Sequence, residues 1–415
     1  MTVLFQSVLP FLAMIVVLIV IHELGHYITA KLAGVKVLEA GIGYPPRIWG
    51  FKRGDTEYTI NAIPLGGFVR MLGEEDPDDP RSLAAKPRWI RLVVLGSGAA
   101  MNVVLAVALF ALAVSIPRTV DQSFARIAEV VPGSPAEEAG LQVGDIIFEV
   151  DGHEVQNIGQ LSYRIRLNLG QTVDMLVRRV GDDGAEFITV PVFSRWATET
   201  YIDAEGIERP QGPTGITISP AYGSIRTLTL EEQEEIRLLI LEEAGLSPTD
   251  ELPPGEVVPT TQMVPFNGSE WEPPWEAIPT GIARSYESII LARNEIESRI
   301  RGGISGGGGG FQVTGPVGIA QLTGEVVDVA GWKSLIEFAA LISMNLAVLN
   351  ILPLPMLDGG RIVFVLIEFV RRGKRIAPQK EAMVHLVGLV AMLLFAVIIT
   401  YFDVLRIIAG DGIIR

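Results

Sequence analysis

Two histidines and a glutamate are spaced so that they could hold and use a metal ion. The segment His22-Glu23-Leu24-Gly25-His26 places its two imidazoles four residues apart. At about 100° per residue, positions four apart on a helix point from one face, so both rings can reach one ion. Glu23 lies beside that ion and can take a proton from bound water. The spacing therefore predicts a Zn²⁺ site with Glu23 as its base, and the alternative is a pair of buried, hydrogen-bonded histidines.

A third ligand must come from elsewhere in the chain, because a catalytic zinc usually takes three protein ligands and a water. The chain has no cysteine and only four histidines, so the ligands are histidines or carboxylates. Asp358 follows two prolines that interrupt an apolar segment, and a broken helix allows a side chain to turn inward. Asp358 could instead cap a helix that starts at Gly359. Glu337 and Glu368 are competing carboxylates on regular helical stretches.

The composition places part of this chain in lipid. Of its 415 residues, 49% are hydrophobic and only 20% are charged, which is too little charge to cover a soluble protein of this size. The net charge of −15 argues against a nucleic-acid partner. The absence of cysteine excludes disulfide scaffolds and cysteine nucleophiles. We therefore expect a membrane part joined to at least one soluble module.

Four apolar stretches are long enough to cross a bilayer as helices, for which about 20 residues are needed. They are residues 3–30, 92–116, 338–357 and 382–402. A removable signal peptide is the alternative for the first stretch, but no Lys or Arg precedes it and it has no small-residue cleavage site. The two histidines and Glu23 lie in this first stretch, where polar groups are costly unless they have a function.

The distribution of basic residues predicts the orientation. Residues 31–91 carry ten Lys and Arg, and residues 371–380 carry five. Residues 118–333 carry 15 basic and 33 acidic residues. Because basic residues near membrane ends stay in the cytoplasm, we expect both termini and the large middle region outside. His26 precedes Lys31 by about 7 Å along a helix, so the metal site should lie in the membrane near the cytoplasmic face.

The regions between the spans have different characters. Residues 47–51 and 58–62 read as a β-hairpin around a Gly54-Asp55 turn. Residues 124–194 predict a small α/β module with strands at 146–150, 173–177 and 186–190. Its helices should begin near Ser134-Pro135 and Asn157. The acidic, Pro/Gly-rich residues 195–272 read as an exposed insertion, 275–300 as an amphipathic helix, and 302–310 as a flexible joint.

At this point the chain resembles the site-2 protease family of intramembrane zinc metalloproteases, and most closely the bacterial regulator-of-sigma-E protease group. The matching segments are residues 22–26, 41–46, 63–74, 315–320 and 345–360, in the order that the family has. Residues 126–192, with their Pro132-Gly133-Ser134-Pro135-Ala136 and Asp151-Gly152 segments, resemble a PDZ domain of the bacterial protease type. Two features depart from the sigma-E pattern, because only one PDZ signature is evident and residues 195–272 are an addition.

The resemblance implies an intramembrane zinc metalloprotease that hydrolyses peptide bonds in or near transmembrane segments, for example of anti-sigma factors or remnant signal peptides. It implies that Zn²⁺ is bound by His22, His26 and Asp358, that Glu23 is the general base, and that Asn345 and Asn350 bind substrate. The partners would be transmembrane protein substrates and membrane lipid, with no nucleic acid. The location would be the bacterial inner membrane, with the PDZ domain outside the cytoplasm.

The expected fold is an α-helical multi-pass membrane protein with four transmembrane helices, a membrane-associated β-hairpin region and an extracytoplasmic α/β PDZ-like domain. We expect that domain either to bind substrate ectodomains or to exclude them. A membrane-tethered PDZ scaffold without turnover is the alternative function, and a metal transporter is disfavoured because no internal repeat is evident. The expected transmembrane helices occupy residues 1–33, 91–117, 335–372 and 382–408. Between them we expect the membrane-associated β region at 34–90, the PDZ-like domain at 124–194, the acidic insertion at 195–272, and the amphipathic helix with the Gly-rich joint at 273–334.

Overall fold

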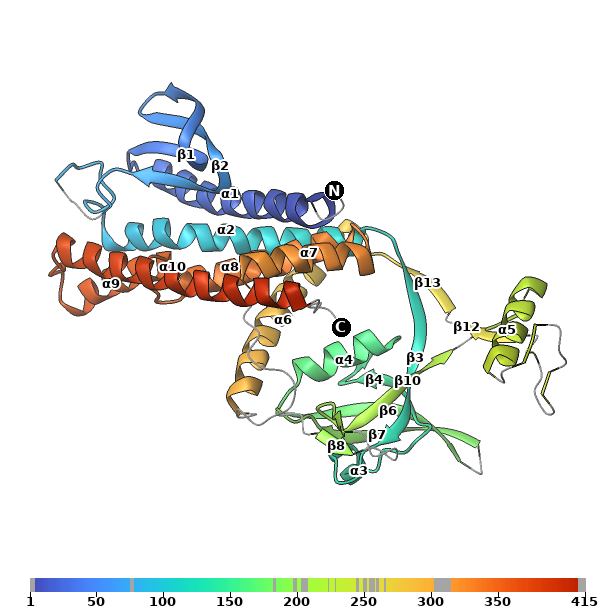
Figure 1. Cartoon of the computed structure of the whole chain (residues 1–415). Coiled ribbons are helices and arrows are strands. Elements are labelled where there is room, and N and C mark those ends of the chain that lie inside the picture. The colour runs from blue at the N-terminus through green and yellow to red at the C-terminus, as the bar shows by residue number, and fades with distance from the viewer. Residues whose placement is uncertain are drawn as a thin grey trace. The chain divides into compact units, whose positions relative to one another are not determined.

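The computed structural model describes most of the chain and divides it into two compact units (Figure 1). One unit comprises Met1–Ile116, Trp271–Ile289 and Gln312–Arg415, and the other comprises Pro117–Glu270 and Ile290–Phe311. The described residues are 4–74, 78–181, 184–196, 200–202, 208–222, 224–227, 229–243, 246–248, 252–253, 258, 261–264, 266–301 and 315–409. The predicted flexible joint at 302–310 lies outside them.

The first unit contains the apolar helices. Within the described residues, four helices are long and apolar enough to cross a membrane: Phe5–Leu32, Arg88–Ser115, Ser334–Ile351 and Pro378–Ile408. They correspond to a short π-helical turn (Leu4–Val8) with α1 (Leu9–Leu32), and to α2 (Arg88–Ser115), α8 (Ser334–Ile351) and α10 (Pro378–Ala409). The part of the chain described thus contains the four candidate membrane-spanning helices that the sequence predicted.

Three further helices belong wholly or partly to this unit. Helix α9 (Asp358–Val370) follows α8 after a turn, α7 (Pro316–Ala330) precedes it, and α6 (Pro274–Arg301) begins here and ends in the second unit. Helix α6 is the predicted amphipathic helix. Helix α7 was not predicted, although Pro316 occupies its first turn, where a missing N–H costs nothing.

The predicted hairpin is confirmed and is longer than expected. Strand β1 (Val37–Arg53) pairs antiparallel with β2 (Thr56–Met71) around the Gly54-Asp55 turn. Both strands bend, so the first part of β1 pairs with each half of β2: Gly41 is opposite Thr59 on one side and Phe68 on the other. Gly43 and Gly66 have φ of +77° and +108°, which favours glycine at the bends. The two long strands therefore form a curled sheet that leaves residues 67–71 at an edge.

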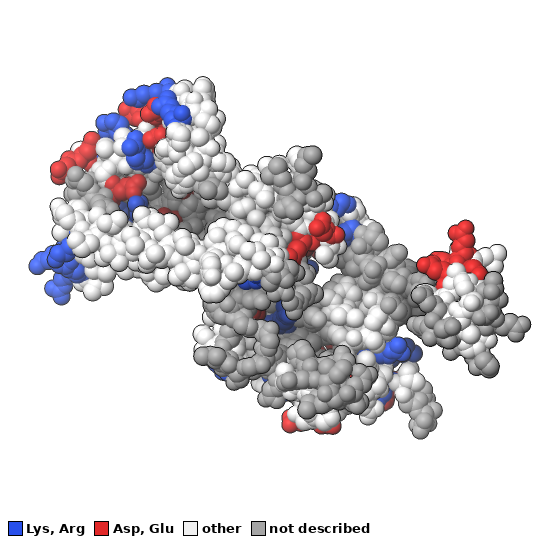
Figure 2. All heavy atoms as spheres, viewed as in Figure 1, with Lys and Arg blue, Asp and Glu red and all other residues white. Residues whose placement is uncertain are grey.

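Charged side chains gather at one end of this unit. Figure 2 shows Lys and Arg at the tip of β1–β2 and at the α9–α10 connection, whereas the surface of the long helices is mostly white. The two basic connections meet, because Arg375 donates from its guanidinium to the carbonyl of Ala84 at 2.6 Å. The first and third connections thus lie on the same side of the helices, as alternating spans require.

The second unit is built around one antiparallel sheet. Its strand order is β10-β3-β4-β6-β7, with β5 paired to β4 and β13 paired to β3. The strands are β3 (Arg118–Val130), β4 (Ile146–Val150), β5 (His153–Glu154), β6 (Thr172–Gly181), β7 (Gly184–Phe193), β10 (Ile216–Tyr222) and β13 (Phe266–Glu270). The remaining elements are α3 (Pro135–Glu138), α4 (Ile158–Leu167), α5 (Leu230–Glu243), β8 (Thr200–Ile202), β9 (Glu208–Pro210), β11 (Ser224–Thr227) and β12 (Thr261–Val264).

Two helices of this unit, α3 and α4, start where the sequence predicts. The Ser134 hydroxyl accepts from the Glu137 amide at 3.3 Å at the start of α3, and Asn157 accepts from the Gln160 amide at 2.9 Å at the start of α4. A buried ion pair supports the same unit, because Arg179 donates two hydrogen bonds to Asp145. These hydrogen bonds raise the pKa of the Arg179 guanidinium.

The predicted boundary at residue 194 differs from the structure. Strand β10 comes from the region expected to be an exposed insertion, yet it is an outer strand of the main sheet beside β3. Ile216 and Ile218 point to one face and pack against the buried core. The acidic, Pro/Gly-rich composition of the region outweighs the short alternation of apolar and polar residues that marks β10 as a strand. The module therefore needs residues well beyond 194 to complete its sheet.

Candidate metal centre

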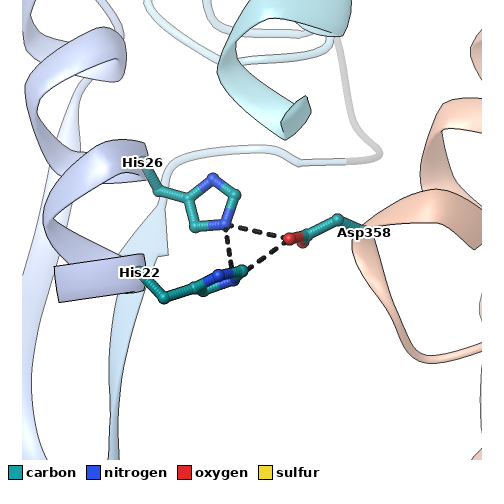
Figure 3. Close-up of side chains that lie close together, drawn as sticks. All are labelled: His22, His26 and Asp358. Carbon is teal, nitrogen blue, oxygen red and sulfur yellow. Dashed lines mark hydrogen bonds and ion pairs between the residues drawn. The ribbon is translucent and has the colours of Figure 1, made fainter. Parts of the chain in front are cut away.

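Three side chains from distant parts of the chain meet at one point (Figure 3). His22 and His26 project from α1, and Asp358 is the first residue of α9. The two Nε2 atoms are 3.2 Å apart, and the Asp358 Oδ2 lies 3.1 Å from that of His26 and 3.2 Å from that of His22. Both histidines are buried. The structure thus brings together the three residues that the sequence singled out as ligands.

This triangle has the size of a zinc site. With Zn–N and Zn–O bonds of about 2.0–2.1 Å, neighbouring ligand atoms of a tetrahedron are ~3.3 Å apart. The three observed separations of 3.1–3.2 Å match that edge, so the atoms form one face of a tetrahedron. The chemistry of the donors, two imidazoles and one carboxylate, also suits Zn²⁺. The residues present therefore fit the ion, with its fourth position open.

Helix α2 packs closely against the histidines because glycine occupies the contact points. A Cβ on Gly25 would lie 2.4 Å from the Ser97 carbonyl oxygen, and a Cβ on Gly98 would lie 2.4 Å from the His26 Nε2. Real Cβ atoms do not make such contacts, so any larger residue would force the helices apart. This close approach allows the His26 Nδ1 to donate to the Val94 carbonyl at 2.8 Å.

Asp358 reaches the histidines through a tight turn between α8 and α9. The backbone folds back over the start of α9 so closely that a Cβ on Gly359 would meet the Leu352 carbonyl oxygen at 2.0 Å. A Cβ on Gly360 would meet the Leu354 carbonyl oxygen at 2.4 Å. His385 of α10 holds the turn, because its Nδ1 accepts from the Met356 amide at 3.0 Å. Asp358 is therefore at a helix start, as the capping alternative proposed, but its carboxylate points to the imidazoles.

The other two candidate carboxylates do not join this cluster. Glu368 is buried in an ion pair with Arg91 of α2, with 2.7 Å between the guanidinium and carboxylate atoms. Glu337 lies in the first turn of α8. Among the described residues, only His22, His26 and Asp358 form a group that could hold a metal in this way. The Arg91–Glu368 pair instead anchors α9, the helix that begins with Asp358.

Glu23 is half-buried and faces the curled sheet. A cavity of about 350 Å³ lies between α1 and β1–β2, and Glu23 is part of its wall, together with Tyr27, Phe51, Tyr58 and Phe68. Val69 of the edge strand lines the same cavity as Glu23. The carboxylate thus lies between the histidine face of α1 and the edge strand of the sheet. From there it can exchange a proton with a group that enters from the cavity.

The two asparagines predicted to bind substrate are not part of the cluster. Asn345 is exposed on α8, and Asn350 is half-buried in the last turn of the same helix. Their separation of five residues rotates them by about 140° around the helix axis. The two asparagines therefore project from different faces of α8, and their role in substrate binding stays a prediction.

Several residues that shape the site were not identified from the sequence. Val94, Gly98 and Asn102 of α2 lie against the histidines, and His385 orders the turn before Asp358. The spacing of four residues from Val94 to Gly98 to Asn102 was the available signal, since it places all three on one helical face. A polar Asn102 in an uncharged span was a second signal.

A protein with four apolar helices and a His-His-Asp triangle beside a glutamate belongs to the class of membrane metalloenzymes. The model of peptidase family M50 matches residues 10–395, and the chain belongs to that family. A Clostridium perfringens protein with a zinc metalloprotease name is 32% identical over 392 residues, covering 94% of this chain and 95% of that protein. Zinc metalloprotease RasP of Oceanobacillus iheyensis is 27% identical over 483 residues, covering 97% and 99%.

These comparisons confirm the resemblance to site-2 proteases, so the protein is a membrane zinc metalloprotease and its cofactor is zinc. A solved PDZ domain of an SdrC-like protein from Listeria monocytogenes matches 24% of this chain and 90% of that domain, at 24% identity and a TM-score of 0.17. That score carries no argument about the second unit, whose fold is described above from its own strands.

Replacing Asp358 with Ala should lower zinc affinity by more than about 100-fold, because even partners outside the ligand set cost roughly 10- to 100-fold. Chelator competition on the purified full chain measures this. Glu337→Ala is the matched control, since it removes a carboxylate from the neighbouring helix and should leave affinity unchanged. Normal zinc affinity in the Asp358 variant would transfer the ligand role to another residue.

Proposed function

We propose that His22, His26 and Asp358 bind the catalytic zinc, that Glu23 is the general base, and that the protein hydrolyses peptide bonds in or near transmembrane segments of membrane proteins. The observation that carries this proposal is the ligand triangle within a bundle of membrane-spanning helices, with Glu23 next to it. Two buried imidazoles and a half-buried carboxylate in such a bundle are costly unless they have a function.

The chemistry of the residues fits amide hydrolysis. When bound, zinc supplies Lewis-acid chemistry at the open fourth position. Glu23 takes the proton of the attacking water and delivers it to the leaving amide nitrogen, so that one carboxylate serves both halves of the reaction. The surrounding apolar cavity excludes bulk water and strengthens these interactions.

The substrate would bind as an extended strand along residues 67–71. A transmembrane helix hides its carbonyls in internal hydrogen bonds, so it must unwind before a protease can reach them. An edge strand offers unpaired backbone groups to such a segment. Residues 67–71 pair on one side only with β1, and Gly67 and Val69 lie at Glu23. A strand added there would pass the base.

Asn345 and Asn350 would bind the substrate by hydrogen bonds to its backbone. Asn345 presents its amide on the exposed surface of α8, within a membrane-spanning segment. A polar group there gains little from lipid but can hydrogen-bond an unwound backbone. Asn350 precedes the turn that leads to Asp358, so it is close in sequence to the metal ligand.

The protein would lie in the bacterial inner membrane with its site near the cytoplasmic face. The two basic connections share one end of the helices, which agrees with the rule that Lys and Arg stay inside. His26 is one turn and a half from Lys31, and the curled sheet follows α1 directly. The acidic second unit, with its PDZ-like features, would lie outside the cytoplasm.

The second unit would act as a gate rather than as part of the active site. It follows the outer end of α2, whereas the metal ligands lie toward the inner end of α1, so it contributes no catalytic group. A module of this size can exclude large folded ectodomains, or it can bind a chain end along an edge strand such as β10. We favour exclusion, because it explains the bulk and the acidity of this region.

Glu23→Gln should keep zinc and fold while lowering cleavage of a transmembrane reporter by about 10²- to 10⁴-fold, because only the proton acceptor is lost. Turnover per bound zinc in reconstituted vesicles measures this. Glu337→Gln is the control and should retain activity. Turnover of the Glu23 variant above a few percent would show that another group is the base.

Single cysteines should report the orientation, because the chain has no cysteine of its own. Lys52→Cys, in the β1–β2 hairpin, should react with a membrane-impermeant reagent only after the cells are opened. Asp174→Cys, on the exposed surface of the second unit, should react in intact cells. The reverse result would place the metal site at the outer face.

Deleting the second unit should extend cleavage to substrates that have intact ectodomains and leave cleavage of trimmed substrates unchanged. The deletion spans residues 117–270, the larger of the two segments of this unit, since removal of 126–192 alone would leave β10 without most of its partner strand. A short Gly-Ser linker can close the gap, because the Glu272 amide donates to the Val114 carbonyl at 2.9 Å.

One further variant makes this deletion informative. Glu23→Gln in the deletion background should abolish cleavage of both substrates, which shows that the new products come from this site. If a zinc-loaded deletion protein fails to cleave the trimmed substrate, the module takes part in substrate recognition and exclusion is wrong.

A further inference from the structure

Helix α2 presents one stripe of residues to the two histidines. Val94, Gly98 and Asn102 are spaced by four residues and so lie on the same face. The Val94 carbonyl accepts from His26 Nδ1, and Gly98 leaves room for both rings. The side-chain amide of Asn102 is 3.4 Å from the His22 Nδ1. Each imidazole therefore has its own partner on α2, on the side opposite to Asp358.

The role of these partners follows from the tautomer that metal binding needs. Both histidines present Nε2 to the Asp358 oxygen, so a metal at that point would take Nε2 from each ring. A neutral imidazole that binds through Nε2 carries its proton on Nδ1, which must then donate. For His26 the acceptor is the Val94 carbonyl. For His22 the neighbour is an amide, which offers either a donor or an acceptor.

The placement of the Asn102 amide leaves its oxygen unused. Its nitrogen is the atom nearest to His22, and its Oδ1 is buried without a hydrogen-bond partner among the described residues. The two ends of an amide have nearly the same shape, and a half-turn exchanges them. That half-turn would point Oδ1 at the His22 Nδ1–H and turn the amide N–H groups to where Oδ1 now lies. Asn102 is 1% exposed, so water does not compete for its amide.

We propose that Asn102 accepts the Nδ1–H of His22 through its Oδ1 and so fixes the tautomer and ring orientation that present Nε2 to the metal. Asn102 is thus a positioning residue, and this inference rests on the proposed role of His22 as a ligand. The backbone of Asn102 is held separately, since its carbonyl accepts from the Ser343 hydroxyl of α8 at 2.8 Å. The side chain is therefore free to serve the imidazole alone.

Two substitutions separate an acceptor from a donor at position 102. Asn102→Asp keeps an oxygen acceptor and loses the amide hydrogens, whereas Asn102→Leu keeps the volume and loses the acceptor. Affinity for Zn²⁺ is measured by chelator competition on the purified full chain, and Co²⁺ absorption reports the ligand geometry. We expect Asn102→Leu to lower affinity by roughly 10- to 100-fold. Asn102→Asp should stay within a few-fold of the unsubstituted protein and keep its Co²⁺ spectrum.

The opposite result for the aspartate overturns the inference. If the amide nitrogen donates to an unprotonated Nδ1, a carboxylate would repel that ring, and Asn102→Asp would lose as much affinity as Asn102→Leu. Because the aspartate variant alone decides this, the inference stays testable if the leucine variant does not fold. Thermal unfolding of each metal-free variant shows whether that variant is folded. Zinc affinities are compared only among variants that are folded.

Two controls distinguish this inference from the proposed function. Ser343→Ala removes the hydrogen bond to the Asn102 backbone and leaves its side chain, so zinc affinity should not change. His22→Ala should lose zinc. If it keeps zinc at full affinity, the proposed ligand set fails. If it loses zinc while Asn102→Leu keeps it within a few-fold, only the role of Asn102 fails.

Discussion

The meeting of two imidazoles and one carboxylate inside an apolar helix bundle is the constraint on which the rest of the structure depends. Their atoms lie 3.1–3.2 Å apart, a separation that fits three ligands of one ion. Lipid and apolar side chains cannot solvate such groups. The helix bundle must therefore supply a hydrogen-bond or ion-pair partner for each of these groups. The elements around the site provide those partners.

The supports come mainly from close backbone approach. Glycines at the α1–α2 contact and at the start of α9 remove the side chains that would keep these elements apart. Backbone carbonyls and amides then come near enough to orient side chains, as with Val94 and His26 or Met356 and His385. Small residues in membrane helices allow this packing, because association there depends on contact rather than on the exclusion of water. The buried Arg91–Glu368 pair ties α9 to α2 in the same region.

The curled sheet lies beside the site, and the second unit is a separate compact part of the chain. The bends in β1 and β2 bring one edge of the sheet to Glu23, so an edge strand and a carboxylate line the same cavity. The second unit has its own core and its own sheet, completed by β10. The metal centre and the main antiparallel sheet thus belong to separate compact units of one chain.

The sequence by itself determined the elements that local chemistry specifies. The four apolar runs, the ligands spaced by four residues and the capped helices at Ser134 and Asn157 depend on composition and short spacings. Only the tertiary structure decided what lies next to what. It placed Asp358 rather than Glu368 at the histidines. The tight turn at Gly359 and Gly360 directs Asp358 toward the imidazoles, whereas Glu368 is paired with Arg91. It also joined Ile216 and Ile218 to the main sheet and Asn102 to His22, since such contacts link residues far apart along the chain, where no local pattern records them.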